Sequence, residues 1–140
     1  MKVLQVSAEI FPLLKTGGLA DIAGALPLAL KGAGADVRVL LPGFPAVREA
    51  LQDAVVVANL SAPWREPVRL MAGTLPAVAK GLRAYVIDAP ALYDRPGNPY
   101  EDARRQAYAD NHRRFALLGW MAAQLALGAD PKWRPQVLHS

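Results

Sequence analysis

The sequence predicts an α/β domain with a Rossmann-like, mostly parallel sheet, flanking helices and an antiparallel hairpin excursion around residues 54–87. Residues 2–7 form a short apolar run with the β-branched residues typical of a buried strand, and a helical pattern follows from Leu19. A second strand pattern covers residues 36–41 and ends at a Pro-Gly pair. Strand, helix and strand within roughly 40 residues make a βαβ unit, whose crossover connects parallel strands.

After this unit, the chain has several strand candidates that lack a helical crossover. They are residues 54–58, 67–72 and 82–87, and glycine and proline separate them. Because no helical period lies between them, we expect hairpin connections and antiparallel pairing. The remaining predicted elements are a short helical turn at 44–51, a turn-rich loop at 88–97, a long helix at 102–127 and a core strand at 135–140.

Apolar spacing identifies the inward face expected for each helix. In the first helix the predicted stripe is Leu19, Ile22, Ala23, Leu26 and Leu30. In the long helix it is Ala107, Asn111, Phe115, Leu118, Ala122 and Leu125. Pro27 lies within the first helix and cannot donate a backbone hydrogen bond, so we expect a kink or a restart of the helix there.

Composition limits the classes of function. The 140 residues, of which 53% are hydrophobic and 20% charged, describe a folded domain that can bury a core. The absence of cysteine excludes disulfides and thiolate metal sites, and the two histidines give little material for a metal centre. The composition therefore gives little support for a metal centre. The apolar stretches are too short for a signal peptide or a membrane span, which predicts a cytoplasmic protein without a membrane partner.

The net charge of +4 does not by itself indicate nucleic-acid binding. Basic residues are spread along the chain, and the only cluster, at residues 104–105 and 112–114, has carboxylates among it. A solvated helix face explains that cluster, because no aromatic-interleaved RNA motif or zinc finger accompanies it. We therefore expect no nucleic-acid partner, and the sequence leaves the oligomeric state open.

Lys15-Thr16-Gly17-Gly18 lies between the first strand and the first helix. A Gly-Gly pair at such a junction lets the backbone come close to a ligand and leaves amide N–H groups free. These amides and the positive end of the helix dipole favour a phosphate or carboxylate, and Lys15 adds a full charge. The alternative is that the glycines only permit a tight turn and that Lys15 is solvent-exposed.

Two familiar phosphate-binding loops do not fit this turn. A Walker loop has its lysine after the last glycine, followed by Ser or Thr, whereas Lys15 precedes Gly17. A dinucleotide fingerprint needs Gly-x-Gly-x-x-Gly and an acidic residue at the end of the second strand, but that strand ends in Leu41-Pro42-Gly43. An NAD-dependent enzyme is therefore not expected.

Longer motifs in the chain carry a family resemblance. The first runs from Ser7 to Asp21 as Ser-Ala-Glu-Ile-Phe-Pro-Leu-Leu-Lys-Thr-Gly-Gly-Leu-Ala-Asp and continues as Gly-Ala-Leu-Pro at 24–27. Further motifs are residues 37–42, the loop 93–100, residues 114–120 and residues 133–139. Together they resemble bacterial glycogen synthases and plant starch synthases. The resemblance runs nearly from end to end.

This resemblance implies part of the N-terminal lobe of a two-lobed GT-B glycosyltransferase. Members of the family transfer glucose from ADP-glucose to the non-reducing end of an α-1,4-glucan in glycogen biosynthesis, retain the anomeric configuration and need no metal. The implied partners are ADP-glucose and a glucan acceptor. ADP-glucose is a substrate in this family, so the resemblance implies no metal and no cofactor. Lys15 corresponds to the lysine that interacts with the donor diphosphate in this family, and Gly17 and Gly18 would bring backbone amides to the same group.

Four further positions match the family, each with a competing structural explanation. Asp21 is assigned to donor binding, although a carboxylate at a helix start also stabilises the helix dipole. Glu9 borders the expected sugar and acceptor cleft, or is a solvated loop carboxylate. Tyr100 lines the same cleft, or anchors its loop against the long helix. His139 matches the family's strand-end histidine and is also placed at the cleft, but the His-Asp-Trp-His sequence of the family is missing.

Family members are several times longer than this chain, so residues 1–140 are expected to be an incomplete N-terminal lobe without the C-terminal lobe. The catalytic histidine region, the other phosphate-binding Arg and Lys and the late carboxylate motif of the family lie beyond Ser140. No catalytic residue is assigned within the chain, and the chain alone is expected to be inactive. Two alternatives stay open: another GT-B nucleotide-sugar transferase, and a standalone non-catalytic module that binds a nucleotide-sugar or a glucan.

Overall fold

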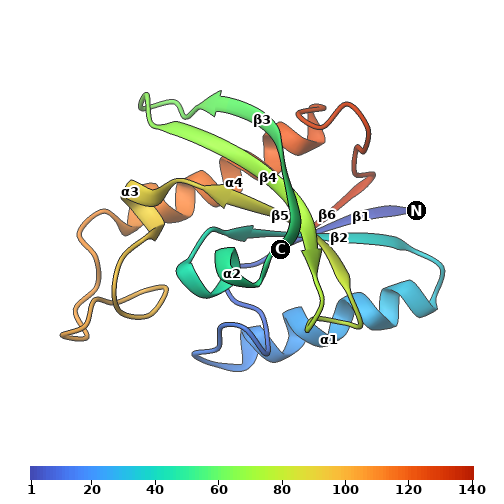
Figure 1. The fold of residues 1–140 in the computed structure, drawn as a ribbon, viewed down its shortest axis with the longest axis horizontal. Coiled ribbons are helices and arrows are strands. Elements are labelled where there is room, and N and C mark those ends of the chain that lie inside the picture. Colours follow the sequence, from blue (N-terminus) through green and yellow to red (C-terminus); the bar gives the residue numbers. More distant parts are fainter.

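The computed structural model describes residues 1–140 and contains one six-stranded sheet with helices (Figure 1). The strands are β1 (Lys2–Val6), β2 (Asp36–Pro42), β3 (Gln52–Ser61), β4 (Pro67–Leu75), β5 (Leu82–Asp88) and β6 (Val137–His139). The helices are α1 (Gly18–Gly32), α2 (Pro45–Ala50), α3 (Pro90–Tyr93) and α4 (Asn111–Ala126). Across the sheet the strand order is β3-β4-β5-β2-β1-β6.

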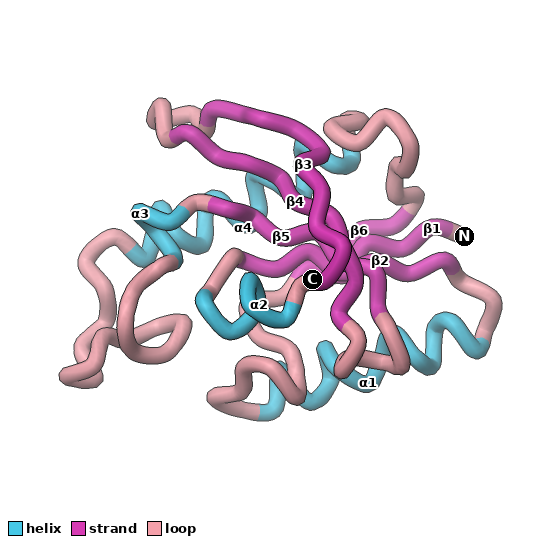
Figure 2. The backbone as a smooth tube through the Cα atoms, viewed as in Figure 1, coloured by secondary structure: helices cyan, strands magenta, loops and turns pink.

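The sheet is parallel on one side and antiparallel on the other. β1 pairs in parallel with β2 and β6, and β2 pairs in parallel with β5. β4 pairs antiparallel with both β5 and β3, so the long β3–β4 hairpin extends the sheet beyond β5 (Figure 2). This arrangement confirms the predicted α/β class, with a mostly parallel sheet and an antiparallel excursion.

The two faces of the sheet belong to separate hydrophobic cores, because successive strand residues point to opposite faces. Leu40 of β2 lies in the core under α4, together with Leu117 and Met121 of that helix. Its neighbours Val39 and Leu41 lie in the core on the α1 side. β2 is therefore apolar on both faces, as expected for a parallel strand covered on both sides.

α1 turns small residues, rather than its largest ones, toward the protein interior. Leu19 and Ile22 are 49% and 63% exposed, so the predicted inward stripe is wrong at these two positions. Close approach explains the difference, since a Cβ at Gly24 would lie 2.6 Å from the backbone oxygen of Phe11. The buried residues of α1 are Ala20, Ala23 and Pro27.

Pro27 lies inside α1, which continues to Gly32 as one helix. Because proline has no amide hydrogen, the carbonyl of Ala23 one turn earlier lacks its usual helical donor. The Gln5 side chain of β1 supplies a donor, and its Nε2 lies 3.0 Å from the Ala23 oxygen. Gln5 is 3% exposed, so this hydrogen bond ties the helix to a central strand inside the core.

The last helix is shorter than predicted, because α4 begins at Asn111 rather than at residue 102. The Asp102 carboxylate accepts hydrogen bonds from the backbone amides of Arg104 and Gln106. Such bonds from a side chain to the nearby backbone compete with helix formation, and the chain turns here instead. Ala107, the first residue of the predicted stripe, therefore lies outside the helix. The buried face of α4 consists of Arg114, Leu117, Leu118, Met121, Ala122 and Leu125.

β6 is an edge strand and not the predicted core strand. It covers Val137–His139 instead of residues 135–140, and it pairs only with β1. All of its residues are exposed. The apolar sequence of a strand alone therefore does not predict whether another element packs over that strand.

We predict that Gly24→Ala destabilises the protein, although alanine is normally the better helix former. The added methyl group would meet the Phe11 carbonyl, so the loop or the helix must shift. Overpacking costs about 1–3 kcal/mol, which exceeds the gain of about 1 kcal/mol from helix propensity. Thermal and urea unfolding measure the change.

Gly32→Ala is the matched control for this substitution. Gly32 lies in the last turn of the same helix, and a Cβ there would meet no atom within 4 Å. The Tm of Gly32→Ala should equal that of the natural protein or exceed it. Equal Tm changes for the two variants would contradict the close contact between α1 and the Phe11 loop.

Candidate functional site

The turn between β1 and α1 presents a helix N-terminus at the carboxyl edge of the parallel strands. After β1 the chain forms a small loop closed by the Ile10–Leu14 bridge, and it then runs through Lys15 to the start of α1 at Gly18. Gly17 is the N-cap residue, and no side chain caps the helix. The first amides of an α-helix have no intrahelical acceptor, so those of α1 can bind an anion.

The fold itself does not require the two glycines of the turn. Gly17 has φ −160° and ψ −164°, an extended conformation that any residue adopts. A Cβ at Gly17 or Gly18 would meet no atom within 4 Å. The space in front of both residues is therefore open, and a ligand can approach their backbone without meeting a side chain.

Lys15 is paired with Asp21 across the turn. The Lys15 Nζ lies 2.9 and 2.8 Å from the two carboxylate oxygens of Asp21, a residue of the first turn of α1. Both side chains are about half exposed, at 47% and 51%. Such a solvent-screened pair is typically worth less than about 1 kcal/mol. An anion with more than one negative charge can therefore compete with Asp21 for Lys15.

The Glu9 carboxylate holds the Lys15–Gly18 turn in place through hydrogen bonds. It is 3% exposed, and its Oε2 accepts a hydrogen bond from the Thr16 backbone amide at 2.6 Å. Its Oε1 accepts from the Thr16 hydroxyl at 2.8 Å and from the Tyr100 hydroxyl at 2.6 Å. Glu9 is therefore not the solvated loop carboxylate that the sequence left as an alternative. Its carboxylate joins the turn to the loop that carries Tyr100.

Hydrogen bonding sets the protonation states of this cluster. Burial raises the pKa of Glu9, but hydrogen bonds from Tyr100 and Thr16, with the Gly17 amide nearby, outweigh burial and hold it below the ordinary value of 4.5. Burial and the hydrogen bond to Glu9 raise the pKa of Tyr100. At neutral pH the cluster therefore contains a carboxylate and a neutral phenol, so that donors face acceptors.

The loop that carries Tyr100 is anchored on α4. The Tyr100 ring stacks on Phe115 with centroids 5.5 Å apart and an interplanar angle of 21°. Asn111 donates from its side chain to the Tyr100 carbonyl at 2.9 Å. Tyr100 thus anchors its loop on the helix, and it also binds Glu9. A hollow of about 170 Å³ is lined by residues of this loop between 95 and 99, by Leu14 next to the turn, and by residues 44–46 at the start of α2.

Arg114 organises the same loop and was missed as a site residue in the sequence. It is 1% exposed, and burial lowers its pKa. Its Nε donates to the Leu92 carbonyl at 2.7 Å, and its Nη1 donates to the Pro99 carbonyl at 2.9 Å and to Asn111 Oδ1 at 2.7 Å. The available signal was an arginine next to the apolar stripe of a predicted helix, because a buried arginine needs several acceptors.

His139 lies apart from the Glu9 cluster. It is exposed at the end of β6 and stands in register with Gln5 of β1, so it lies toward the carboxyl edge of the sheet. Its side chain forms no hydrogen bond or ion pair. The structure therefore joins Glu9 to Tyr100 through direct contact, but it leaves His139 free.

No group of three or more His, Asp or Glu side chains is close enough together to hold a metal ion. None of the helices combines the length and the apolar character that a helix needs to cross a membrane.

The sequence matches the family model of the starch synthase catalytic domain over residues 2–140. The chain therefore belongs to the starch synthase catalytic domain family, which confirms the resemblance. It is 65% identical over 143 residues to the glycogen synthase of Variovorax paradoxus (strain S110). It is 57% identical over 140 residues to the glycogen synthase of Serratia proteamaculans (strain 568).

These alignments cover 100% of this chain but only 29% and 28% of the two relatives, so the chain spans less than a third of their length. A solved structure, the catalytic domain of starch synthase IV from Arabidopsis thaliana bound to ADP and acarbose, matches with a TM-score of 0.70. The identity is 24%, and the match covers 98% of this chain and 27% of that chain. The likeness confirms the predicted fold.

We predict that Glu9→Gln loosens the turn and destabilises the protein at neutral pH. The glutamine amide would place a donor against the donors of Thr16 or Tyr100. Hydrogen bonds to charged groups are typically worth about 1.5–3 kcal/mol. Because the folded-state pKa of Glu9 is depressed, the stabilisation is complete above the ordinary pKa of 4.5 and is lost as the pH falls through the folded-state value.

Unfolding curves from pH 7 down to pH 3 test this expectation. The gap in Tm between the natural protein and Glu9→Gln should be widest at pH 7 and should narrow in acid. Glu49→Gln is the control, since Glu49 is exposed on α2 and has no side-chain partner. A gap that stays constant with pH, or one matched by Glu49→Gln, would refute the role of the Glu9 carboxylate.

Proposed function

We propose that the complete protein is a retaining glucosyltransferase that moves glucose from ADP-glucose to the non-reducing end of an α-1,4-glucan. In this proposal the Lys15–Gly18 turn binds the donor diphosphate. The observation that carries it is an uncapped helix N-terminus with Lys15 beside it, in a chain of the starch synthase family. The ADP and acarbose bound in the starch synthase IV structure support the same classes of ligand.

The chemistry of donor cleavage fits the groups at the turn. Breaking the bond between glucose and the diphosphate leaves negative charge on the departing ADP. The free amides of α1, the helix dipole and the Lys15 ammonium stabilise that charge. Hydrogen bonds from Thr16 to Glu9 hold the turn in place beforehand, so little reorganisation is needed as the charge develops.

Asp21 acts on the donor through Lys15. Without donor, the Asp21 carboxylate holds the Lys15 ammonium beside the helix N-terminus. A diphosphate carries more charge than one carboxylate and also accepts hydrogen bonds from the helix amides. It therefore displaces Asp21 as the partner of the Lys15 ammonium. Asp21 stays in the first turn of α1, where a carboxylate stabilises the helix dipole.

On the acceptor side, Glu9 and Tyr100 position the cleft rather than contact sugar. Their polar atoms bind each other and Thr16, which leaves the Glu9 carboxylate buried. His139 is exposed and free of partners, so it is the predicted cleft residue that can reach a sugar. No metal or other cofactor has a role in this proposal.

We predict that Lys15→Ala in the complete protein lowers kcat/KM for ADP-glucose by about 10- to 150-fold. This range corresponds to the loss of one charge-assisted contact of about 1.5–3 kcal/mol. Initial rates at saturating glucan, with ADP-glucose or UDP-glucose as donor, measure the effect and identify the preferred donor. Lys2→Ala is the control, because Lys2 is an exposed lysine whose side chain has no partner. If Lys15→Ala leaves the donor kinetics unchanged, the assignment of the turn to the donor site is wrong.

We predict that residues 1–140 alone transfer no glucose, because they span less than a third of the relatives' length. The assay measures incorporation of labelled glucose from ADP-glucose into a maltodextrin, with the complete protein as the positive control. Circular dichroism of the purified chain establishes that a negative result comes from folded material. Clear turnover by residues 1–140 would show that this part carries the chemistry by itself.

A further inference from the structure

A hollow lined by two arginines lies near the amino ends of the parallel strands, whereas the Lys15 turn lies at their carboxyl ends. Arg38 and Arg83 lie near the amino ends of the parallel strands β2 and β5, whereas the turn follows the carboxyl end of β1. The hollow has a volume of about 160 Å³, and an adjoining one of about 380 Å³ shares Arg38, Val55, Ala72 and Arg83 with it. This place is therefore separate from the candidate donor site.

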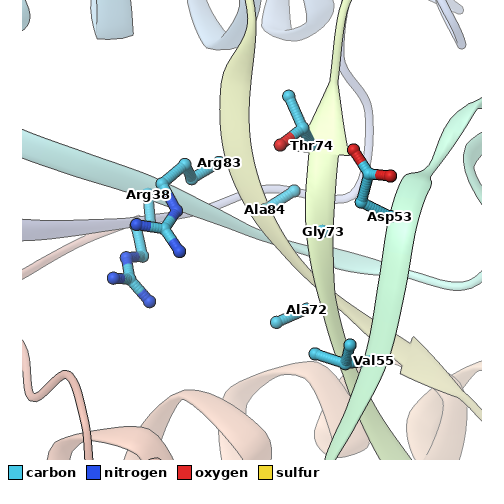
Figure 3. A pocket seen from close by; sticks show the side chains of 8 residues that line it. All are labelled: Arg38, Asp53, Val55, Ala72, Gly73, Thr74, Arg83 and Ala84. Carbon is cyan, nitrogen blue, oxygen red and sulfur yellow. The ribbon is translucent and has the colours of Figure 1, made fainter.

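The two arginines stand side by side on neighbouring strands. Arg38 is in direct register with Arg83, and both side chains reach out on the same side of the sheet (Figure 3). Like charges in such cross-strand positions destabilise a sheet. Arg83 is exposed and forms no side-chain hydrogen bond or ion pair. An anion between the two guanidinium groups would relieve the repulsion.

Arg38 is held in place before any ligand arrives. Its side chain is 11% exposed, its Nη1 donates to the Tyr85 hydroxyl at 2.7 Å, and its guanidinium lies 4.5 Å from the centre of the Trp133 ring. Its nearest carboxylate is that of Asp130 at 3.6 Å, which also accepts a hydrogen bond from Tyr85 at 2.6 Å. The buried Nε of Arg38 has no partner, so its donors are not all satisfied.

The rest of the lining gives the hollow two chemically different ends. Asp53 lies across β4 from the arginines, with Thr74 between them (Figure 3). Asp53 is exposed and has no ion-pair partner within the chain, and the Thr74 hydroxyl is also unpaired. Lys132 adds a third cation at the adjoining hollow. The titratable lining groups are thus Arg38, Arg83 and Lys132 against Asp53 and Asp130.

We propose that this hollow is a second anion site, which binds a small phosphate monoester that carries hydroxyl groups. The phosphate lies between Arg38 and Arg83, since a guanidinium matches phosphate oxygens with paired N–H donors. The hydroxyl groups of the ligand donate to the Asp53 carboxylate and pair with the Thr74 hydroxyl. The proposal does not depend on the function assigned to the Lys15 turn.

The experiment uses the complete protein with Lys15→Ala, which weakens phosphate binding at the turn, and binding that remains is assigned to the arginine hollow only where Arg83→Ala reduces it. Phosphorus NMR line broadening measures the binding of inorganic phosphate and of glycerol 3-phosphate, and proton line broadening measures glycerol as the neutral control. We expect both phosphates to bind, glycerol 3-phosphate more tightly, and glycerol not at all. Adding Arg83→Ala should raise both dissociation constants at least about tenfold, as expected for one charge-assisted contact. Asp53→Asn should remove the preference for glycerol 3-phosphate.

Arg113→Ala is the charge-matched control, because Arg113 is exposed on α4 and its side chain has no partner. It should leave both dissociation constants unchanged. Absence of phosphate binding, or equal weakening by Arg83→Ala and Arg113→Ala, would overturn the site. Equal affinity for the two phosphates would overturn the role of Asp53. Arg83 is exposed and forms no side-chain hydrogen bond or ion pair, so Arg83→Ala removes no contact of this kind from the fold.

Discussion

The candidate site depends on the hydrogen bonds that the buried Glu9 carboxylate accepts. It receives three hydrogen bonds, two from Thr16 and one from Tyr100, a residue 91 positions away in the chain. A carboxylate that is 3% exposed stays ionised only because these donors replace water. In return, the donors fix the backbone that leads into α1. One side chain therefore sets the direction of a helix N-terminus and the position of a distant loop.

The same arrangement gives the two carboxylates near the turn different roles. Glu9 directs both oxygens inward to Thr16 and Tyr100, so its lone pairs are engaged by the protein. Asp21 faces solvent and engages Lys15. A ligand at the helix N-terminus therefore competes with a weak, exposed ion pair, while the stronger buried cluster beneath it stays intact.

Local patterns in the sequence were sufficient for the βαβ unit, the hairpin excursion and the place of the Lys15–Gly18 turn, since each rests on neighbouring residues. The start of α4 was not predictable from apolar spacing, because the Asp102 side chain binds nearby amides and interrupts the helix. The contact between Glu9 and Tyr100 has no local signal at all. The inward face of α1 depended on how closely the Phe11 loop approaches Gly24, which only packing decides.

Pro27 also fixes the register of α1 against the sheet. A regular helix offers no free carbonyl in its middle, so it can slide along a strand without breaking a specific bond. Pro27 leaves one free carbonyl, at Ala23, and the Gln5 side chain binds it inside the core. A slip by one residue would leave that carbonyl buried without a donor, at a cost of about 1–3 kcal/mol. Pro27 and the Gln5 hydrogen bond therefore fix the position of α1 along the sheet. They also fix the position of the helix N-terminus relative to the carboxyl ends of the parallel strands.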